Sequence, residues 1–275
     1  MFKAIFKAIF GFVQFAANRI RAWIPQVAAS LILFGYLGDA LQAMLQLRMH
    51  AHHMAMLMNG WETIGVIYML LDIAIILTGT VLIAYSCDCN DGSGNGVAML
   101  WLQRTLRTLA FSIWDYELLL HYCVDVGCLL LLLLAMRQSQ RQATAGVCWQ
   151  HDRQQQRSLQ RLLSVARIGM CCVCLLWIVE PHQIINKPFA VACFILMLLG
   201  IRCKLLASLM IAPLLWQANG SLIWGWNDLT ISLQFISSML SKVAGLLLLT
   251  RLGGGKWSLD ALINRTTKSP LNTGD

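Results

Sequence analysis

The stretch TIGVIYMLLDIAIILTGTVLIAYS, residues 63–86, decides the fold class, because it is almost wholly apolar over 24 residues and carries a single charge, Asp72. As a helix it is about 36 Å long, enough to cross a bilayer core of about 30 Å with some tilt. The whole chain has this character, since 58% of its 275 residues are hydrophobic and 12% are charged. A typical soluble domain has about 25% charged residues. We therefore exclude an ordinary soluble enzyme, a disordered chain and a disulfide-stapled secreted domain, and we predict an all-α, polytopic transmembrane helix bundle.

Seven further apolar runs predict the other spans, which gives about eight in total. They cover residues 23–47, 97–114, 117–136, 162–180, 188–201, 203–217 and 231–250. The runs at 188–201 and 203–217 are short and separated only by Arg202, so they form either one bent unit or a tight hairpin of two helices. Together the runs define a transmembrane domain over residues 23–250.

Polar segments flank and interrupt this domain. Residues 1–22 repeat Phe and Ile at helical spacing, with Lys3 and Lys7 on another face, which predicts an amphipathic helix in the membrane interface. The Arg- and Gln-rich stretch 137–161 predicts a polar loop, and residues 251–275 predict a polar tail.

The distribution of basic residues predicts the orientation. With a cytosolic N-terminus and eight spans, 16 of the 21 Lys and Arg residues lie on the cytosolic side, and only Arg48 and Lys187 lie on the far side. Basic residues gather on the cytosolic side of membrane proteins, so this bias favours eight spans with both termini and the 137–161 loop in the cytosol. Seven spans, the alternative, would place the basic tail on the wrong side. The net charge of +8 therefore indicates topology and no nucleic-acid partner, since the basic residues lie between apolar runs.

Motifs of soluble catalysis and cofactor binding are missing from the sequence. There is no G-x-x-x-x-G-K-[ST], H-E-x-x-H or G-x-S-x-G pattern, and the glycine-rich GSGNG precedes a span instead of following a strand. His50, His52 and His53 lie among methionines, a composition that can bind copper, but no second ligand cluster anchors them. A solvated loop is the favoured interpretation there, and we expect no cofactor and no metal. Asn219 begins an N-x-[ST] sequence on the predicted lumenal side and is a candidate for glycosylation.

Ionisable side chains inside the predicted spans are the most informative polar feature. Each costs at least about 2.5–3.5 kcal/mol at the bilayer centre, so each needs a partner, water or the interface. One interpretation is internal ion pairing that orders the bundle. The other is a polar cavity reached from the lumen, whose acidic groups hold a positively charged ligand such as a free peptide N-terminus. The residues are Asp39, Asp72, Arg104, Arg107, Asp125 and Lys242.

Four groups of residues, in order along nearly the whole chain, carry a family resemblance. They are WIPQVA with YLGDA at 23–28 and 36–40, TLAFSIWD at 108–115 before a leucine run, Gly200-x-x-x-Lys204-Leu205, and LLLLTRLGGGKWSLD at 246–260. This ordered set resembles the Surfeit-four type of endoplasmic-reticulum cargo receptor. The family's glycine triplet is Val126, Gly127 and Cys128 here, so the chain resembles a diverged member.

The resemblance implies a polytopic protein with cytosolic termini that is not an enzyme. Such receptors reside in the membranes of the endoplasmic reticulum and of the intermediate compartment or Golgi. They bind soluble secretory cargo in the lumen, through N-terminal segments exposed after signal-peptide removal, and couple it to COPII vesicles. The family's acidic position maps onto Asp39 and its Trp-Asp pair onto Trp114 and Asp115, which are the candidate cargo-binding residues. The chain ends KSPLNTGD where family members commonly carry a dilysine signal, which leaves its route of retrieval open.

Two other classes of protein compete with this interpretation. A small membrane transporter or lipid-handling protein also uses embedded Asp and Arg, although no inverted repeat is visible in the sequence. A membrane oxidoreductase follows from fold-level analogy alone, and no haem or flavin signature supports it.

Overall fold

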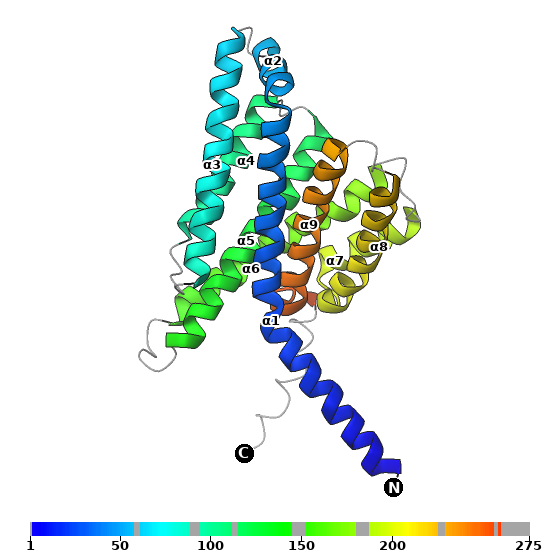
Figure 1. Cartoon of the computed structure of the whole chain (residues 1–275). Coiled ribbons are helices and arrows are strands. Elements are labelled where there is room, and N and C mark those ends of the chain that lie inside the picture. Colours follow the sequence, from blue (N-terminus) through cyan, green and yellow to red (C-terminus); the bar gives the residue numbers. More distant parts are fainter. Residues whose placement is uncertain are drawn as a thin grey trace.

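The computed structural model describes residues 2–57, 61–88, 94–111, 115–144, 152–179, 187–224, 229–255 and 258–259. Over these residues the chain is helical, which confirms the predicted all-α fold (Figure 1). The helices are α1 (Phe2–Leu45), α2 (Leu47–Leu57), α3 (Glu62–Asp88), α4 (Asn95–Phe111), α5 (Tyr116–Thr144), α6 (Asp152–Val179), α7 (Lys187–Leu199), α8 (Cys203–Trp224) and α9 (Leu229–Leu252).

Five described helices contain segments long and apolar enough to cross a membrane. These segments are Trp23–Leu45, Glu62–Ser86, Tyr116–Gln140, Ser158–Val179 and Phe235–Leu252. Shorter apolar helices cover Lys187–Leu199 and Cys203–Gln217, so the runs on either side of Arg202 are two helices. The multi-pass membrane bundle is thus confirmed, while the total of eight spans stays a prediction.

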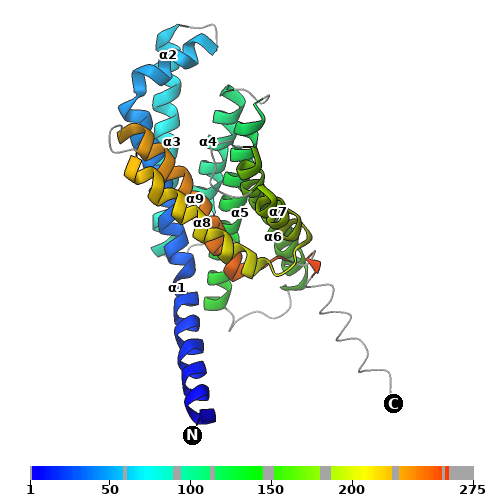
Figure 2. The same ribbon diagram turned by 90° about the vertical axis from the view of Figure 1, so that its right-hand side faces the viewer.

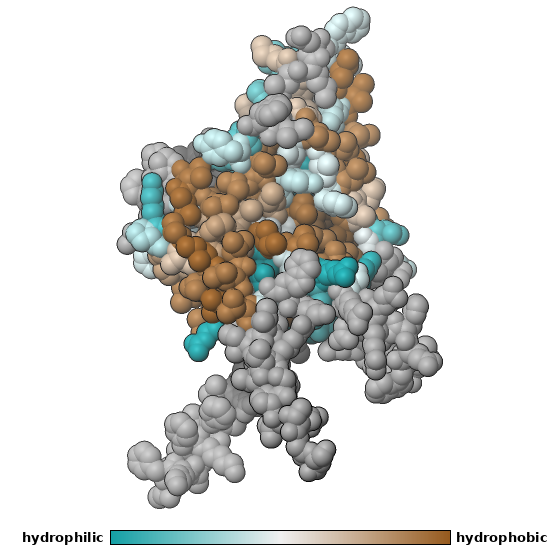
Figure 3. Space-filling view, turned by 180° about the vertical axis from the view of Figure 1, so that it is seen from behind, coloured by the Kyte–Doolittle hydropathy of each residue, from teal (hydrophilic) through white to brown (hydrophobic). Residues whose placement is uncertain are grey.

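The outer surface of the bundle is largely apolar. Figure 3 shows a broad face in which hydrophobic side chains dominate. Large apolar residues such as Ile67 on α3 and Leu205 on α8 have more than half of their surface exposed (61% and 52%). In water such a surface would drive association, whereas in a bilayer it contacts lipid chains that are equally apolar.

The core of the bundle is built around α9. This helix packs against α1, α5, α6 and α8, and α1 lies along it in both ribbon views (Figures 1 and 2). Apolar residues of these helices form one continuous buried cluster that includes Trp177 of α6. A smaller cluster joins α2 to α3 through Met54, Met69 and Ile73. Residues far apart in the sequence therefore meet on the inner face of α9.

Two glycines let α5 and α6 approach each other closely. A Cβ atom on Gly169 would lie 2.7 Å from the carbonyl oxygen of Cys123, and one on Gly127 would lie 3.0 Å from the carbonyl oxygen of Ala166. Small residues at helix crossings are a common way to bring membrane helices together, because backbone then packs against backbone. This crossing holds α5, which carries Asp125, against α6.

The structure corrects the predicted secondary structure of the polar segments. Most of the stretch 137–161 is helical, because α5 continues to Thr144 and α6 begins at Asp152. Arg and Gln are good helix formers, so loss of hydropathy there does not end the helices.

The loop predicted around His50, His52 and His53 is also wrong. These residues belong to α2, whose buried Ala51 and Met54 pack inward while His52 and His53 stay exposed. At the N-terminus, residues 2–22 are helical as expected and continue into the first span as one helix, α1. Their side chains lie outside the described residues, so their interfacial position stays a prediction.

Candidate functional site

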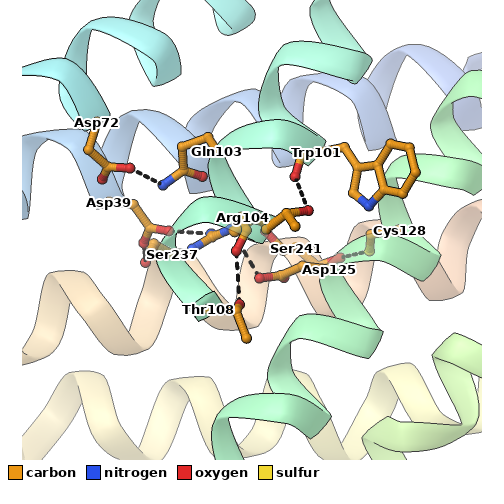
Figure 4. A network of polar contacts seen from close by, with 11 residues as sticks. Asp39, Asp72, Trp101, Gln103, Arg104, Thr108, Asp125, Cys128, Ser237 and Ser241 are labelled. Carbon is orange, nitrogen blue, oxygen red and sulfur yellow. Dashed lines mark hydrogen bonds and ion pairs between the residues drawn. The ribbon is translucent and has the colours of Figure 1, made fainter. Parts of the chain in front are cut away.

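Arg104 of α4 lies between two carboxylates from different helices. Its Nη2 donates to Oδ2 of Asp39 on α1, and its Nε lies 3.1 Å from Oδ2 of Asp125 on α5 (Figure 4). A planar guanidinium has several donors in a fixed fork, so one arginine can bridge two acidic groups. This single side chain therefore ties α1, α4 and α5 together.

Two further residues complete the surroundings of this arginine. Ser237 of α9 donates from its hydroxyl to Oδ1 of Asp39 at 2.5 Å. The ring of Tyr36, one turn before Asp39 on α1, lies under the guanidinium, with its centroid 4.7 Å from Cζ of Arg104. We call Tyr36, Asp39, Arg104, Asp125 and Ser237 the Arg104 cluster. It draws on four helices, and its hydrogen-bonded residues Asp39 and Ser237 are 198 positions apart.

Lys242 of α9 adds a second positive charge next to the cluster. Its side chain is buried, and its charge interacts with that of Asp125. Close by, Cys128 of α5 donates to the carbonyl oxygen of Ser241 at 2.7 Å, which joins α5 and α9 directly (Figure 4). Two carboxylates and one guanidinium leave a net charge of about −1, which Lys242 compensates, so the group is close to neutral inside the bundle.

The three paired charges lie at a similar depth. At about 1.5 Å per residue, Asp39 is about 9 Å from the C-terminal end of α1, Arg104 about 10 Å from that of α4, and Asp125 about 14 Å from the start of α5. All three distances are measured from the bundle end that the basic-residue distribution predicts to be lumenal. The exposed fractions of the Asp39, Arg104 and Asp125 side chains are small, between 13% and 19%.

The other two predicted intramembrane charges lie beside this cluster. Asp72 of α3 is buried and accepts a hydrogen bond from Nε2 of Gln103 at 2.9 Å, which joins α3 to α4. Arg107 lies one turn after Arg104 on α4, and its charge interacts with that of Asp72. The structure thus brings the six predicted intramembrane charges into one region of the bundle.

Asp115 lies apart from the Arg104 cluster. It is exposed at the start of α5, about 15 Å along the helix from Asp125. Its Oδ1 accepts a hydrogen bond from the backbone N–H of Glu117 at 3.0 Å, so it caps the N-terminus of α5. Trp114 lies outside the described residues. Asn219 belongs to helix α8, but its side chain is outside the part of the chain that the structure describes.

Sequence reasoning missed three members of this region. Tyr36 precedes Asp39 by three residues and therefore shares its helix face, which is a local signal that could have identified it. Ser237 and Gln103 are harder to identify from the sequence. Single polar residues are common in apolar helices, and the residues to which these two bond are distant in the sequence. Within the part of the chain that the structure describes, no group of three or more His, Cys, Asp or Glu residues is placed to hold a metal ion.

Comparison with known proteins now adds to this geometry. The sequence model of the SURF4 family matches residues 6–265. This chain belongs to the SURF4 family. A relative from Drosophila melanogaster, described as Surfeit locus protein 4 homolog, is 24% identical over 245 residues, which cover 86% of this chain and 88% of the relative. No solved structure matches. The resemblance seen in the sequence segments is confirmed.

Proposed function

We propose that this SURF4-family chain is a receptor or adaptor for soluble secretory proteins on their way from the endoplasmic reticulum to the Golgi. The family match over nearly the whole chain is the observation that carries the proposal. The multi-pass helical bundle supports it, because a receptor that joins lumenal cargo to a cytosolic coat must cross the membrane. This role is one of binding and transport rather than of catalysis.

The Arg104 cluster is the proposed docking point for cargo. A cargo protein that has lost its signal peptide presents a positively charged α-amino group. Asp39 and Asp125 share one guanidinium, so either carboxylate has lone pairs left to accept hydrogen bonds from that amine. The amine can bind beside the guanidinium without displacing it, and the two carboxylates compensate part of its positive charge.

Asp115 is the proposed outer contact for the same cargo. It is exposed at the predicted lumenal end of α5, where it adds negative charge to the approach. Charge at an entrance raises the rate of encounter with an oppositely charged ligand more than it raises final affinity.

The opposite, predicted cytosolic end is the proposed contact with COPII coat components. The ends of α5 and α6 that flank residues 145–151 carry basic residues, and Arg251 lies in the last turn of α9. We place the protein in the membranes of the endoplasmic reticulum and of the intermediate compartment or Golgi, with both termini in the cytosol.

The test is capture of a secreted client by the tagged full chain in cells. Asp39→Asn should lower client co-purification at least about tenfold, because a charge-assisted contact is lost. Asp115→Asn should weaken capture less, and it keeps the helix cap, since Asn caps as well as Asp. Asp72→Asn is the matched control, because Asp72 is also a buried acidic residue, but it bonds to Gln103 outside the cluster.

Receptor abundance is measured in the same samples, so that misfolding is not mistaken for loss of binding. Full capture by Asp39→Asn at normal abundance would contradict the docking point. A client that leaves the endoplasmic reticulum equally fast in cells lacking the chain would contradict the receptor role itself.

A transporter remains the second candidate, because embedded ion clusters also line substrate paths in transporters. The ion pairs of Arg104 are the observation that favours it. Purified protein in liposomes separates the two functions, since solute or lipid flux that Asp39→Asn abolishes would favour the transporter.

A further inference from the structure

A second polar feature lies at the opposite end of the bundle from the Arg104 cluster. A cavity of about 590 Å³ opens where α6, α8 and the end of α9 meet. This volume is typical of small-molecule binding sites, which span about 300–1,000 Å³. The lining includes Gln160 of α6, Arg202 and Lys204 at the start of α8, and Gly253–Gly255 with Ser258 after α9. The distribution of basic residues predicts that this end faces the cytosol.

The glycine turn that forms one wall of the cavity is held rigidly in place. Gly253 and Gly255 have φ values of +83° and +79°, which side chains other than glycine rarely allow. Nη1 of the buried Arg167 on α6 donates to the carbonyl oxygen of Gly254 at 2.8 Å. A Cβ atom on Gly254 would lie 2.8 Å from Sγ of Cys203, so the turn packs directly on the start of α8. The cavity is therefore preformed.

The charge of the cavity favours an anion. Among its described lining residues, the two charged ones are Arg202 and Lys204, and both are basic. Lys204 lies in the N-terminal turn of α8 and Arg202 directly precedes that helix, at the end where backbone N–H groups lack partners within the helix and the helix dipole is positive. Basic side chains and a helix N-terminus together form a common type of phosphate site.

The backbone of Arg202 is a separate sign of function. Its φ of +44° is the one positive value for a residue other than glycine among the described residues. An L-residue is strained in this region, and a glycine would avoid that strain. Strain of this kind concentrates at binding sites, where the side chain contributes something that glycine cannot.

Apolar residues complete the lining of the cavity and connect it to the apolar outer surface of the bundle. Leu163, Leu205 and Leu252 line it, and Leu205 is 52% exposed on the outer apolar surface. A ligand with a phosphate at one end and hydrocarbon at the other matches this arrangement. The cytosolic leaflet contains anionic phospholipids of that kind.

We infer that this cavity binds the phosphate headgroup of an anionic membrane lipid between Arg202 and Lys204, with the acyl chains passing along Leu205. The site is separate from the Arg104 cluster and does not depend on cargo recognition. It gives the protein a means to respond to the lipid composition of the membrane it occupies.

The test is lipid binding to the purified full chain, measured by native mass spectrometry in detergent. The probes are phosphatidic acid, phosphatidylinositol phosphate, phosphatidylcholine and inorganic phosphate. The first two should be retained in preference to phosphatidylcholine. The double variant Arg202→Gln/Lys204→Gln should bind them at least about tenfold more weakly, since two charge-assisted contacts are lost. Arg137→Gln on α5 removes a charge outside the cavity and should bind as the wild type does.

Arg202→Gly separates loss of binding from misfolding. Glycine accepts the positive φ, so the melting temperature should stay equal or rise while lipid binding falls. Wild-type lipid retention by this variant or by the double variant would overturn the site. Equal weakening in Arg137→Gln would overturn its specificity, and inorganic phosphate that binds as tightly as the lipids would overturn the lipid as ligand.

Discussion

Replacement of Arg104 by methionine is the sharpest test of how the bundle is held together. The side chain has similar length and apolar volume, so the change removes the charge with little change in packing. Asp39 and Asp125 would then face each other without the guanidinium that bridges them. Ser237 would still donate to Asp39, and Lys242 would still interact with Asp125.

The size of the effect follows from the burial of these groups. Removal of one partner from a buried ion pair costs about 3–5 kcal/mol, because the remaining charge is left uncompensated. For a chain of this size, each kcal/mol lowers the melting temperature by about 2–3 °C. The melting temperature of Arg104→Met should therefore fall by about 6–15 °C.

Thermal unfolding of the purified protein in detergent, followed by size-exclusion chromatography of heated samples, measures this shift. Arg161→Met, an exposed arginine on α6, is the matched control and should change stability by no more than about 0.5 kcal/mol. The double variant Arg104→Met/Asp39→Asn should regain most of the loss, because Asp125 and Lys242 then compensate each other. An unchanged melting temperature for Arg104→Met, or no recovery in the double variant, would refute the argument that charge compensation stabilises the site.

Three further predictions concern other parts of the molecule. Gly169→Ala should lower stability by about 1–3 kcal/mol, because the added Cβ would lie 2.7 Å from the carbonyl oxygen of Cys123 and push α5 from α6; an unchanged melting temperature would contradict this close crossing. Asp115→Ala should lose about 1 kcal/mol through loss of the α5 cap, whereas Asp115→Asn should not, and equal melting temperatures for the two would refute the cap. Burial, with the charges of Arg107 and His53, lowers the pKa of His50 on α2. The folded state therefore resists protonation there, so stability should fall as the pH drops below about 6.5, where the unfolded chain gains that proton. His50→Gln should flatten this pH dependence, and identical pH profiles would contradict it.

The limits of sequence-based prediction are clearest at the polar stretches. Hydropathy located the apolar helices well, because burial in lipid requires apolar side chains along the whole span. It failed at residues 137–161 and 50–53, since polarity shows where a helix leaves the membrane and not where it ends. The family resemblance rested on short ordered segments of the sequence. The family model that matches residues 6–265 confirms it.

The sequence by itself determined that this protein is a helical membrane bundle, which family it resembles, and that six ionisable residues from distant positions lie within its apolar segments. Only the tertiary structure decided how those charges are matched, that Arg104 bridges Asp39 and Asp125, and that a glycine turn closes a basic cavity beside Lys204. The physical reason is one of range. Hydropathy and helix propensity depend on neighbouring residues, whereas an ion pair between α1 and α4 depends on which helix faces meet, and close packing across distant segments sets those faces.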